Sequence, residues 1–281
     1  MELKNIEMTL NGRIGNMIYE IFSIYYFCQK YNIPTDIIKF NKNYILTDVI
    51  KKQIKLSGND NYLNRNMKFF SNIEEKFFSE DEINSIFFNS SEPFYPYNIC
   101  INLKSPNIEN FLDKNIDYIK NCTNIKFVKY YDDQLTAYSN ITSKIYNNLL
   151  LYKKLFYNKE LFDSVYNNNE ILKNRQRKLY GLSFRIQEFA HKKISDTIKE
   201  INYCVKDESD CYIFSDDIQT LKFNLDTSTL NFKNIYFYNE NEEAYMNLIT
   251  LAMCDKVIGN QPMSSFISNA KILNYIIYNE I

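Results

Sequence analysis

Four short polar segments carry the residues best suited to chemistry, and each follows an apolar, strand-like run. They are residues 12–16 (GRIGN), 183–188 (SFRIQE), 214–217 (FSDD) and 260–265 (NQPMSS). The chain has only five glycines, and four of them lie in or just before these segments: Gly12, Gly15, Gly181 and Gly259. Glycine permits left-handed turns and the close approach of a ligand to the backbone. The pattern predicts a nucleotide-type ligand held by backbone amides at the carboxyl ends of parallel strands.

The first segment is a turn with little steric bulk, which could bind an anion. Its glycines, Gly12 and Gly15, let the backbone approach a ligand, while Asn16 and the start of the following helix supply hydrogen-bond donors. Arg13 adds a cation. The structural alternative is a plain turn between a strand and a helix, in which Asn16 caps the helix.

The second segment places Arg185 directly after a strand, where a side chain reaches the ligand crevice of a parallel sheet. The planar guanidinium suits two phosphate oxygens, and hydrogen bonds to charged groups contribute about 1.5–3 kcal/mol each. The alternative is an ion pair with Glu188 or a surface position. His191, the single histidine, is interpreted as a solvated loop residue.

The third and fourth segments combine acids, amides and hydroxyls at helix starts. Asp216 or Asp217 could accept a hydrogen bond from a guanine edge or a ribose, or ligate a divalent cation. Ser and Asp at this place also suit a cap for a helix from Ile218 onward. Asn260 and Ser264 would surround a phosphate at the start of the last helix, or only cap that helix.

Strands and helices must bring these segments to common edges. In the first half, apolar spacing predicts strands at 3–10, 36–40, 99–103 and 125–128, a helix at 17–31, and one or two helices over 139–172, with no confident pattern elsewhere in 51–135. In the second half, it predicts strands at 179–184, 210–214, 235–238, 256–259 and 275–278, alternating with helices at 193–204, 218–223, 242–254 and 264–273. The fold class is therefore α/β, with two Rossmann-like, doubly wound domains at residues 1–172 and 173–281.

Composition restricts the class of partner and the compartment. The 33 basic and 34 acidic residues nearly cancel, which argues against a nucleic-acid binder. One histidine and six scattered cysteines provide no ordinary zinc site, and we expect reduced thiols in a cytoplasmic protein. No apolar run approaches the ~18 residues of a spanning helix, and the start lacks the apolar core of a signal peptide.

Taken together, the order of the segments resembles the α1,2-fucosyltransferases of glycosyltransferase family 11, and more loosely the wider fucosyltransferase clan with the protein O-fucosyltransferases. Residues 12–16 resemble the G-R-F-G-N-Q of that clan, with Met17 in place of Gln. Residues 183–188 resemble H-x-R-R-x-D, with Ser183 for His, Ile186 for the second Arg and Glu188 for Asp. Residues 214–217 match F-S-D-D fully, and Asn260 and Ser264 match part of N-S-T-F-S-W-W.

The resemblance implies a GT-B fold whose two domains face a cleft, GDP-fucose as the donor, and metal-independent inverting transfer to a glycan hydroxyl. The first domain would take the acceptor and the second the nucleotide sugar. Arg185 falls on the arginine that holds the pyrophosphate, Asp216 or Asp217 on the guanine-reading acid, and Ser264 on a phosphate-contacting hydroxyl. The predicted donor site is Gly12, Arg13, Gly15, Asn16, Ser183, Arg185, Asp216, Asp217, Asn260 and Ser264. The general base is not identified; Glu188 is the nearest motif carboxylate, and Glu20 and Asp36, which are expected near the N-terminal crevice, are weaker candidates.

Two other functions remain open at this point. One is a metal-dependent glycosyltransferase with another donor, in which residues 215–217 hold Mn²⁺, although a spaced D-x-D is absent there. The other is a non-catalytic protein that binds a nucleotide sugar or a glycan, suggested by Ser183 and Ile186. No cofactor, nucleic acid or integral membrane segment is expected in any of these, no metal is expected in the fucosyltransferase, and the oligomeric state is open.

Overall fold

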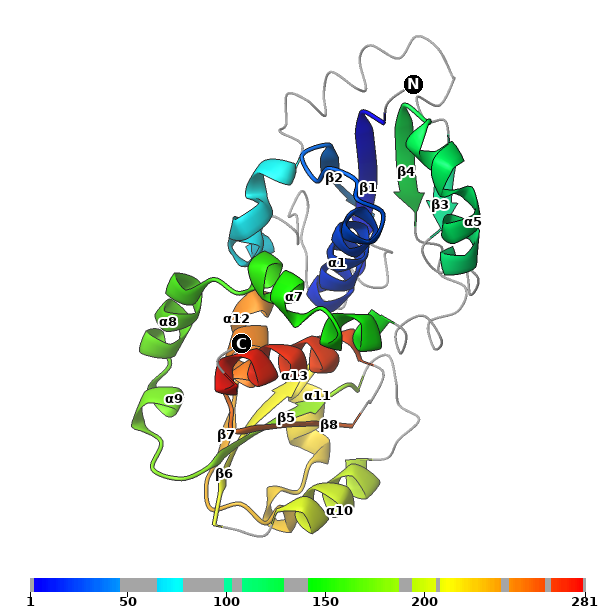
Figure 1. Cartoon of the computed structure of the whole chain (residues 1–281). Coiled ribbons are helices and arrows are strands. Elements are labelled where there is room, and N and C mark those ends of the chain that lie inside the picture. The colour runs from blue at the N-terminus through cyan, green and yellow to red at the C-terminus, as the bar shows by residue number, and fades with distance from the viewer. Residues whose placement is uncertain are drawn as a thin grey trace. The chain divides into compact units, whose positions relative to one another are not determined.

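A computed structural model describes residues 3–45, 65–77, 99–102, 108–128, 141–186, 194–205, 208–238, 243–260 and 264–279 (Figure 1). Contacts within the chain divide it into two compact units, Met1–Asn147 and Asn148–Ile281. Each unit contains a four-stranded parallel sheet with helices along the chain between its strands. The predicted α/β class is confirmed, whereas the cleft between the domains stays a prediction.

The boundary between the units precedes the predicted one, which lies between residues 172 and 173. Three helices separate the two positions: α7 (Leu149–Phe156), α8 (Lys159–Asn168) and α9 (Glu170–Asn174). They belong to the second unit because α8 packs on helix α12 (Ala244–Ala252), and the buried hydroxyl of Tyr152 in α7 donates to Asn269 Oδ1 at 2.6 Å.

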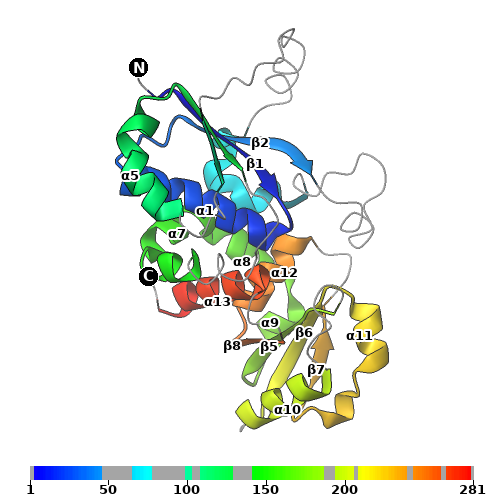
Figure 2. The same cartoon turned by 90° about the vertical axis from the view of Figure 1, so that its right-hand side faces the viewer.

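The first unit is built around strand β1 (Asn5–Asn11), which lies between β2 (Ile38–Ile45) and β4 (Asn124–Val128). Strand β3 (Ile99–Asn102) completes the order β2-β1-β4-β3, and all described pairs are parallel. The 3-10 helix η1 (Met67–Lys76) packs beside β2. Helices α1 (Ile14–Lys30) and α5 (Ile108–Lys120) lie on the same face of the sheet (Figure 2).

Alternating apolar residues of the strands pack this sheet against its helices. Met8 in β1 is fully buried, as are Ile18 and Ile21 on α1. Phe27 of α1 meets Phe127 of β4 edge to face, with ring centroids 5.1 Å apart. Helix α1 begins at Ile14, three residues before the predicted helix start at Met17, and Ile14 is itself buried.

The second unit has the strand order β7-β6-β5-β8, again entirely parallel. Its strands are β5 (Leu179–Phe184), β6 (Asp210–Ser215), β7 (Ile235–Phe237) and β8 (Lys256–Gly259). The helices that follow them are α10 (Ile194–Cys204), α11 (Ile218–Asn224), α12 and α13 (Ser265–Tyr278). Within the described residues, no helix combines the length and apolar composition needed to cross a bilayer.

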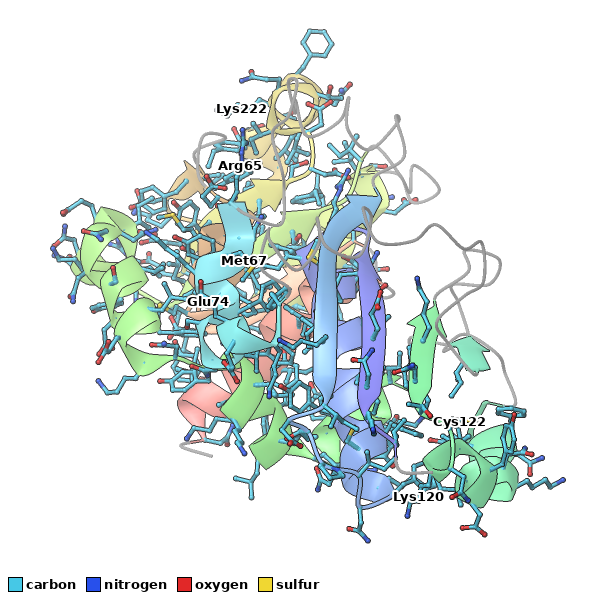
Figure 3. All side chains as sticks on the ribbon, turned by 90° about the horizontal axis from the view of Figure 1, so that it is seen from above. Arg65, Met67, Glu74, Lys120, Cys122 and Lys222 are labelled. Carbon is cyan, nitrogen blue, oxygen red and sulfur yellow. The ribbon has the colours of Figure 1, made fainter. Side chains whose placement is uncertain are left out.

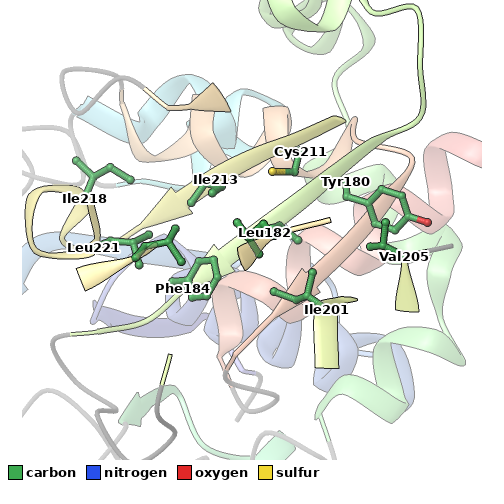
Figure 4. Packing of buried hydrophobic residues seen from close by; sticks show 11 residues of the cluster. Tyr180, Leu182, Phe184, Ile201, Val205, Cys211, Ile213, Ile218 and Leu221 are labelled. Atoms are coloured by element: carbon green, nitrogen blue, oxygen red, sulfur yellow. The ribbon is translucent and has the colours of Figure 1, made fainter. Parts of the chain in front are cut away.

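Strand β5 is buried on both faces, as expected at the centre of a doubly wound sheet. Tyr180, Leu182 and Phe184 contribute to one cluster with residues of α10 and α11 (Figure 4). The alternate side of the strand faces α12, where a Cβ added to Gly181 would lie 2.5 Å from Leu251 Cδ1. Glycine is therefore needed there for close packing of strand and helix.

The predicted last strand at 275–278 is wrong, because α13 continues through Tyr278. Residues Ile272, Leu273 and Ile276 recur at helical spacing and are buried, so the apolar run that suggested a strand is one face of a helix. The side chain of Asn274 fixes that helix by donating to Ala252 O at 2.8 Å and Cys254 O at 2.6 Å.

Thiol reactivity offers a test of this packing. Burial raises the pKa of the Cys28 thiol to about 12, and it raises the pKa values of Cys211 and Cys254 even further above their usual range. Cys122, just past the end of α5 (Figure 3), is also buried, whereas Cys204 is exposed.

We therefore expect iodoacetamide at pH 8 to modify Cys204 well before Cys28, Cys211 or Cys254, because the thiolate is the reactive form. Mass spectrometry of the peptides measures the order, and a sample unfolded in urea provides the control in which all sites react alike. Modification of Cys211 or Cys254 ahead of Cys204 would contradict the packing of the second sheet.

Candidate functional site

Three of the four polar segments meet at the carboxyl edge of the second sheet. In the parallel register, Phe184 of β5 lies opposite Ser215 of β6, and Ser183 lies opposite Gly259 of β8. The next residue, Arg185, therefore emerges between the ends of β6 and β8. The chain runs from β5 through β6 to β7 on one side, whereas β8 lies on the other side of β5, so the strand order reverses here. Ligands of open α/β sheets bind at such a switch point.

Arg185 points into this edge rather than into solvent. Its side chain is 14% exposed, and Nε lies 3.5 Å from Asp216 Oδ2 in an ion pair. Its backbone is held by Asn260, since the Arg185 N–H donates to Asn260 Oδ1 at 2.8 Å and Asn260 Nδ2 donates to Arg185 O at 3.1 Å. The inward ion pair with Asp216 was not predicted from the sequence, and Glu188, the partner considered there, lies outside the described residues.

The two acids of the FSDD segment have different surroundings. Asp216 is buried, with a side chain only 3% exposed, and its Oδ1 accepts the N–H of Ile186 at 2.7 Å. Asp217 is partly exposed and is the N-cap of α11, since its two oxygens accept from the N–H and the hydroxyl of Thr220 at 3.0 and 2.7 Å. The capping alternative is confirmed for Asp217, and Asp216 forms the ion pair with the arginine.

The two serines of the predicted donor site, Ser183 and Ser264, are both buried. Ser264 is buried and is the N-cap of α13, where its Oγ accepts from Ile267 N at 3.5 Å. Ser183 is buried within β5, and its carbonyl accepts the N–H of Asn260 at 3.2 Å. Ser264 thus has the predicted capping role, and its contact with a phosphate stays a prediction.

The GRIGN segment lies in the first unit, at the carboxyl end of β1. Gly12 is buried with φ of +78°, a left-handed conformation that favours glycine. Arg13 is the N-cap of α1, and its carbonyl accepts from the N–H of Asn16 at 2.8 Å. The alternative in which Asn16 caps the helix is wrong, because Asn16 lies inside the first turn with its side chain over Gly12. Gly15 is buried in the same turn.

Of the three carboxylates considered as a general base, the structure describes two. Asp36 is exposed and precedes β2, so in this parallel sheet it lies at the edge opposite the Gly12 turn. Its predicted place near the N-terminal crevice is therefore wrong. Glu20 is buried on α1, less than two turns beyond the helix start. Glu188 and His191 lie outside the described residues.

One aromatic residue at the site was missed in the sequence. Tyr238 directly follows β7, donates its hydroxyl to Ser215 O at 2.8 Å, and stacks on Phe214 with centroids 5.7 Å apart. The available signal was the predicted strand at 235–238, because its carboxyl end shares the edge with the FSDD segment. Tyr238 thereby supports the backbone of that segment.

The described residues contain no group of three or more His, Cys, Asp or Glu side chains arranged to hold a metal ion. In the segment predicted as an alternative Mn²⁺ site, the described hydrogen bonds of Asp217 go to the start of α11, and those of Asp216 to the end of β5. These contacts are with the backbone N–H groups of Ile186 and Thr220 and with the Thr220 hydroxyl.

Comparisons with known proteins identify the fold. No family model and no curated protein matches the chain. The fucosyltransferase NodZ from Bradyrhizobium superposes with a TM-score of 0.52 at 13% identity, over 96% of this chain and 94% of that one. NodZ, an alpha-1,6-fucosyltransferase, soaked with GDP-fucose gives 0.51 at 13% identity, over 96% and 93%. Arabidopsis thaliana FUT1 in a mutant form with GDP gives 0.50 at 9% identity, over 97% and 68%. The chain has the α/β, GT-B-like fold of these structures.

Proposed function

We propose that the protein is an inverting glycosyltransferase that transfers L-fucose from GDP-fucose to a glycan hydroxyl. The observation that carries the proposal is the inward-facing Arg185 at the switch point of the second sheet, beside the FSDD segment. The fold adds support, since similar structures were solved with GDP and GDP-fucose. In this proposal the second unit takes the donor and the first unit the acceptor.

The chemistry is a single displacement at the anomeric carbon of the donor sugar. The oxygen of the acceptor hydroxyl forms a bond to that carbon from the face opposite the nucleotide, while the bond to the diphosphate oxygen breaks and GDP leaves. The hydroxyl proton passes to a base, for which Glu188 is the proposed residue. Because negative charge grows on the departing diphosphate, the main requirement is a fixed positive potential beside it.

Arg185 supplies that potential in the proposed site. Its planar guanidinium can hold two phosphate oxygens at once. The start of α13, capped by Ser264, adds backbone N–H groups and the positive end of a helix dipole. The turn at Gly12, Arg13, Gly15 and Asn16 would provide the same features from the first unit.

The guanine-reading acid is proposed to be Asp216 or Asp217. The hydrogen bonds of Asp217 to Thr220 are exposed, whereas that of Asp216 to Ile186 is partly buried, and a carboxylate that caps a helix has lone pairs for a further donor. Asp216 is more deeply buried and is bonded to the Arg185–Ile186 segment. A guanine base would therefore meet Asp217 first.

Linkage and acceptor are proposed from the resemblance in the motifs. The motifs favour an α1,2 linkage to a galactoside, as in glycosyltransferase family 11. NodZ, in contrast, is an alpha-1,6-fucosyltransferase. NMR of the product formed on lactose-type acceptors distinguishes the two linkages.

A screen of nucleotides tests the donor. GDP and GDP-fucose are expected to raise the melting temperature, since a ligand at 100 times its Kd stabilises the native state by about 2.7 kcal/mol, whereas UDP and CMP are expected to raise it less. An equal response to all three nucleotides, or none to GDP, would contradict the proposal.

Two other candidates are separated by activity measurements. Transfer that persists in EDTA would exclude the metal-dependent enzyme. Binding of GDP-fucose without transfer to any galactoside would instead favour a non-catalytic nucleotide-sugar or glycan-binding protein, which the residues Ser183 and Ile186 in the arginine segment suggest.

A further inference from the structure

The backbone of residues 185 and 186 is hydrogen bonded on both sides although strand β5 has ended. On the β8 side, the Asn260 amide bonds both backbone polar groups of Arg185, at 2.8 and 3.1 Å. On the β6 side, Asp216 Oδ1 accepts the N–H of Ile186 at 2.7 Å. Two side chains therefore replace the strand partners that a longer sheet would supply.

Asn260 is well anchored for this task. Only 4% of the residue is exposed, and its own N–H donates to Ser183 O at 3.2 Å, which continues the pairing of β8 with β5. The amide group has an acceptor and a donor at its tip, and Arg185 presents the complementary N–H and C=O. Neither a carboxylate nor a hydroxyl of similar size reproduces both bonds in the same arrangement.

We propose that Asn260 is a positioning residue that sets the direction of the Arg185 guanidinium, with Asp216 as its counter-ion. The inference rests on the proposed function in one respect, namely that Arg185 binds a diphosphate. Fixing the backbone at Arg185 leaves only the side-chain torsions free, and the ion pair of Nε with Asp216 at 3.5 Å restricts those. Asn260 itself need not touch the ligand.

Asn274 provides a matched control in the same unit. Its amide also holds two backbone groups, Ala252 O and Cys254 O, but these precede β8 and so lie at the amino edge of the sheet. The variants Asn260→Ala and Asn274→Ala each remove two side-chain hydrogen bonds to backbone. Only the first removes them beside Arg185.

The experiment combines NMR of the arginine Nε–H groups in the ligand-free protein with calorimetric titration of GDP and of inorganic pyrophosphate. Asn260→Ala is expected to shift and broaden the Arg185 Nε–H signal, and Asn274→Ala to leave it in place. Both ligands should bind Asn260→Ala about 10-fold more weakly, since part of a charge-assisted interaction is lost. In an Arg185→Ala background, Asn260→Ala should cause no further loss, because the two changes act through one group.

The outcomes separate the inference from the proposed function. An unchanged Arg185 Nε–H signal in Asn260→Ala, or a loss of affinity that persists without Arg185, would overturn the positioning role. A loss for GDP but not for pyrophosphate would also overturn it, since Asn260 would then contact the nucleoside. Failure of the wild-type protein to bind GDP would count against the proposed function alone, and the NMR signal would still decide the role of Asn260.

Discussion

Replacement of Arg185 by alanine is expected to lower kcat by about 10²–10³-fold, the usual cost of removing one preorganised group that stabilises developing charge. The side chain is 14% exposed and lies at the switch point of the second sheet, where water screens its charge less than at an open surface. The measurement is the initial rate of GDP release from GDP-fucose in the presence of a galactoside acceptor.

Two variants control for charge and for fold. Arg175→Ala removes an arginine that also pairs with a carboxylate, Asp255 at 3.2 Å, but Arg175 precedes β5 and so lies at the amino edge. It is expected to lower stability and to leave kcat unchanged. Arg185→Lys keeps the charge but loses the two-pronged geometry, so an intermediate rate is expected. Near-normal turnover of Arg185→Ala would remove this residue from the site.

Replacement of Phe184 by alanine is expected to destabilise the second unit by about 3–5 kcal/mol. Phe184 is 1% exposed and lies in the cluster between β5 and helices α10 and α11. Its removal would leave a cavity in a core that packs from both sides of the sheet. Because the chain has two units, hydrogen exchange followed by mass spectrometry at the peptides of β5 and β6 reports on this unit by itself.

Phe223 provides the matched control on helix α11. It is the same residue type in the same unit but is 90% exposed, so Phe223→Ala should change stability by no more than about 0.5 kcal/mol. Equal exchange rates in the two variants would show that Phe184 does not contribute to the stability of the core. Faster exchange in Phe184→Ala alone would agree with the structure.

Periodicity and turn chemistry were enough to predict most elements of the second unit. The strand at 179–184 is confirmed at its predicted bounds as β5, and the helix at 218–223 is confirmed to within one residue as α11. These elements are short, strongly apolar on the buried face and bounded by polar residues, so the signals lie within a few residues of one another. The strand predicted at 275–278 was wrong because a short apolar run is typical of both strands and buried helices, so the pattern does not distinguish them.

The sequence by itself determined which residue types follow each strand, and hence that an arginine, two acids and an amide would reach the edge of a parallel sheet. Only the tertiary structure decided their pairing. Arg185 is bonded to Asn260 across 75 positions, and Ile186 to Asp216 across 30, because β5 lies between β6 and β8 in register. Apolar patterns in the sequence determine which residues are buried. Strand order and register determine which strand ends lie side by side, and both depend on the packing of the whole unit.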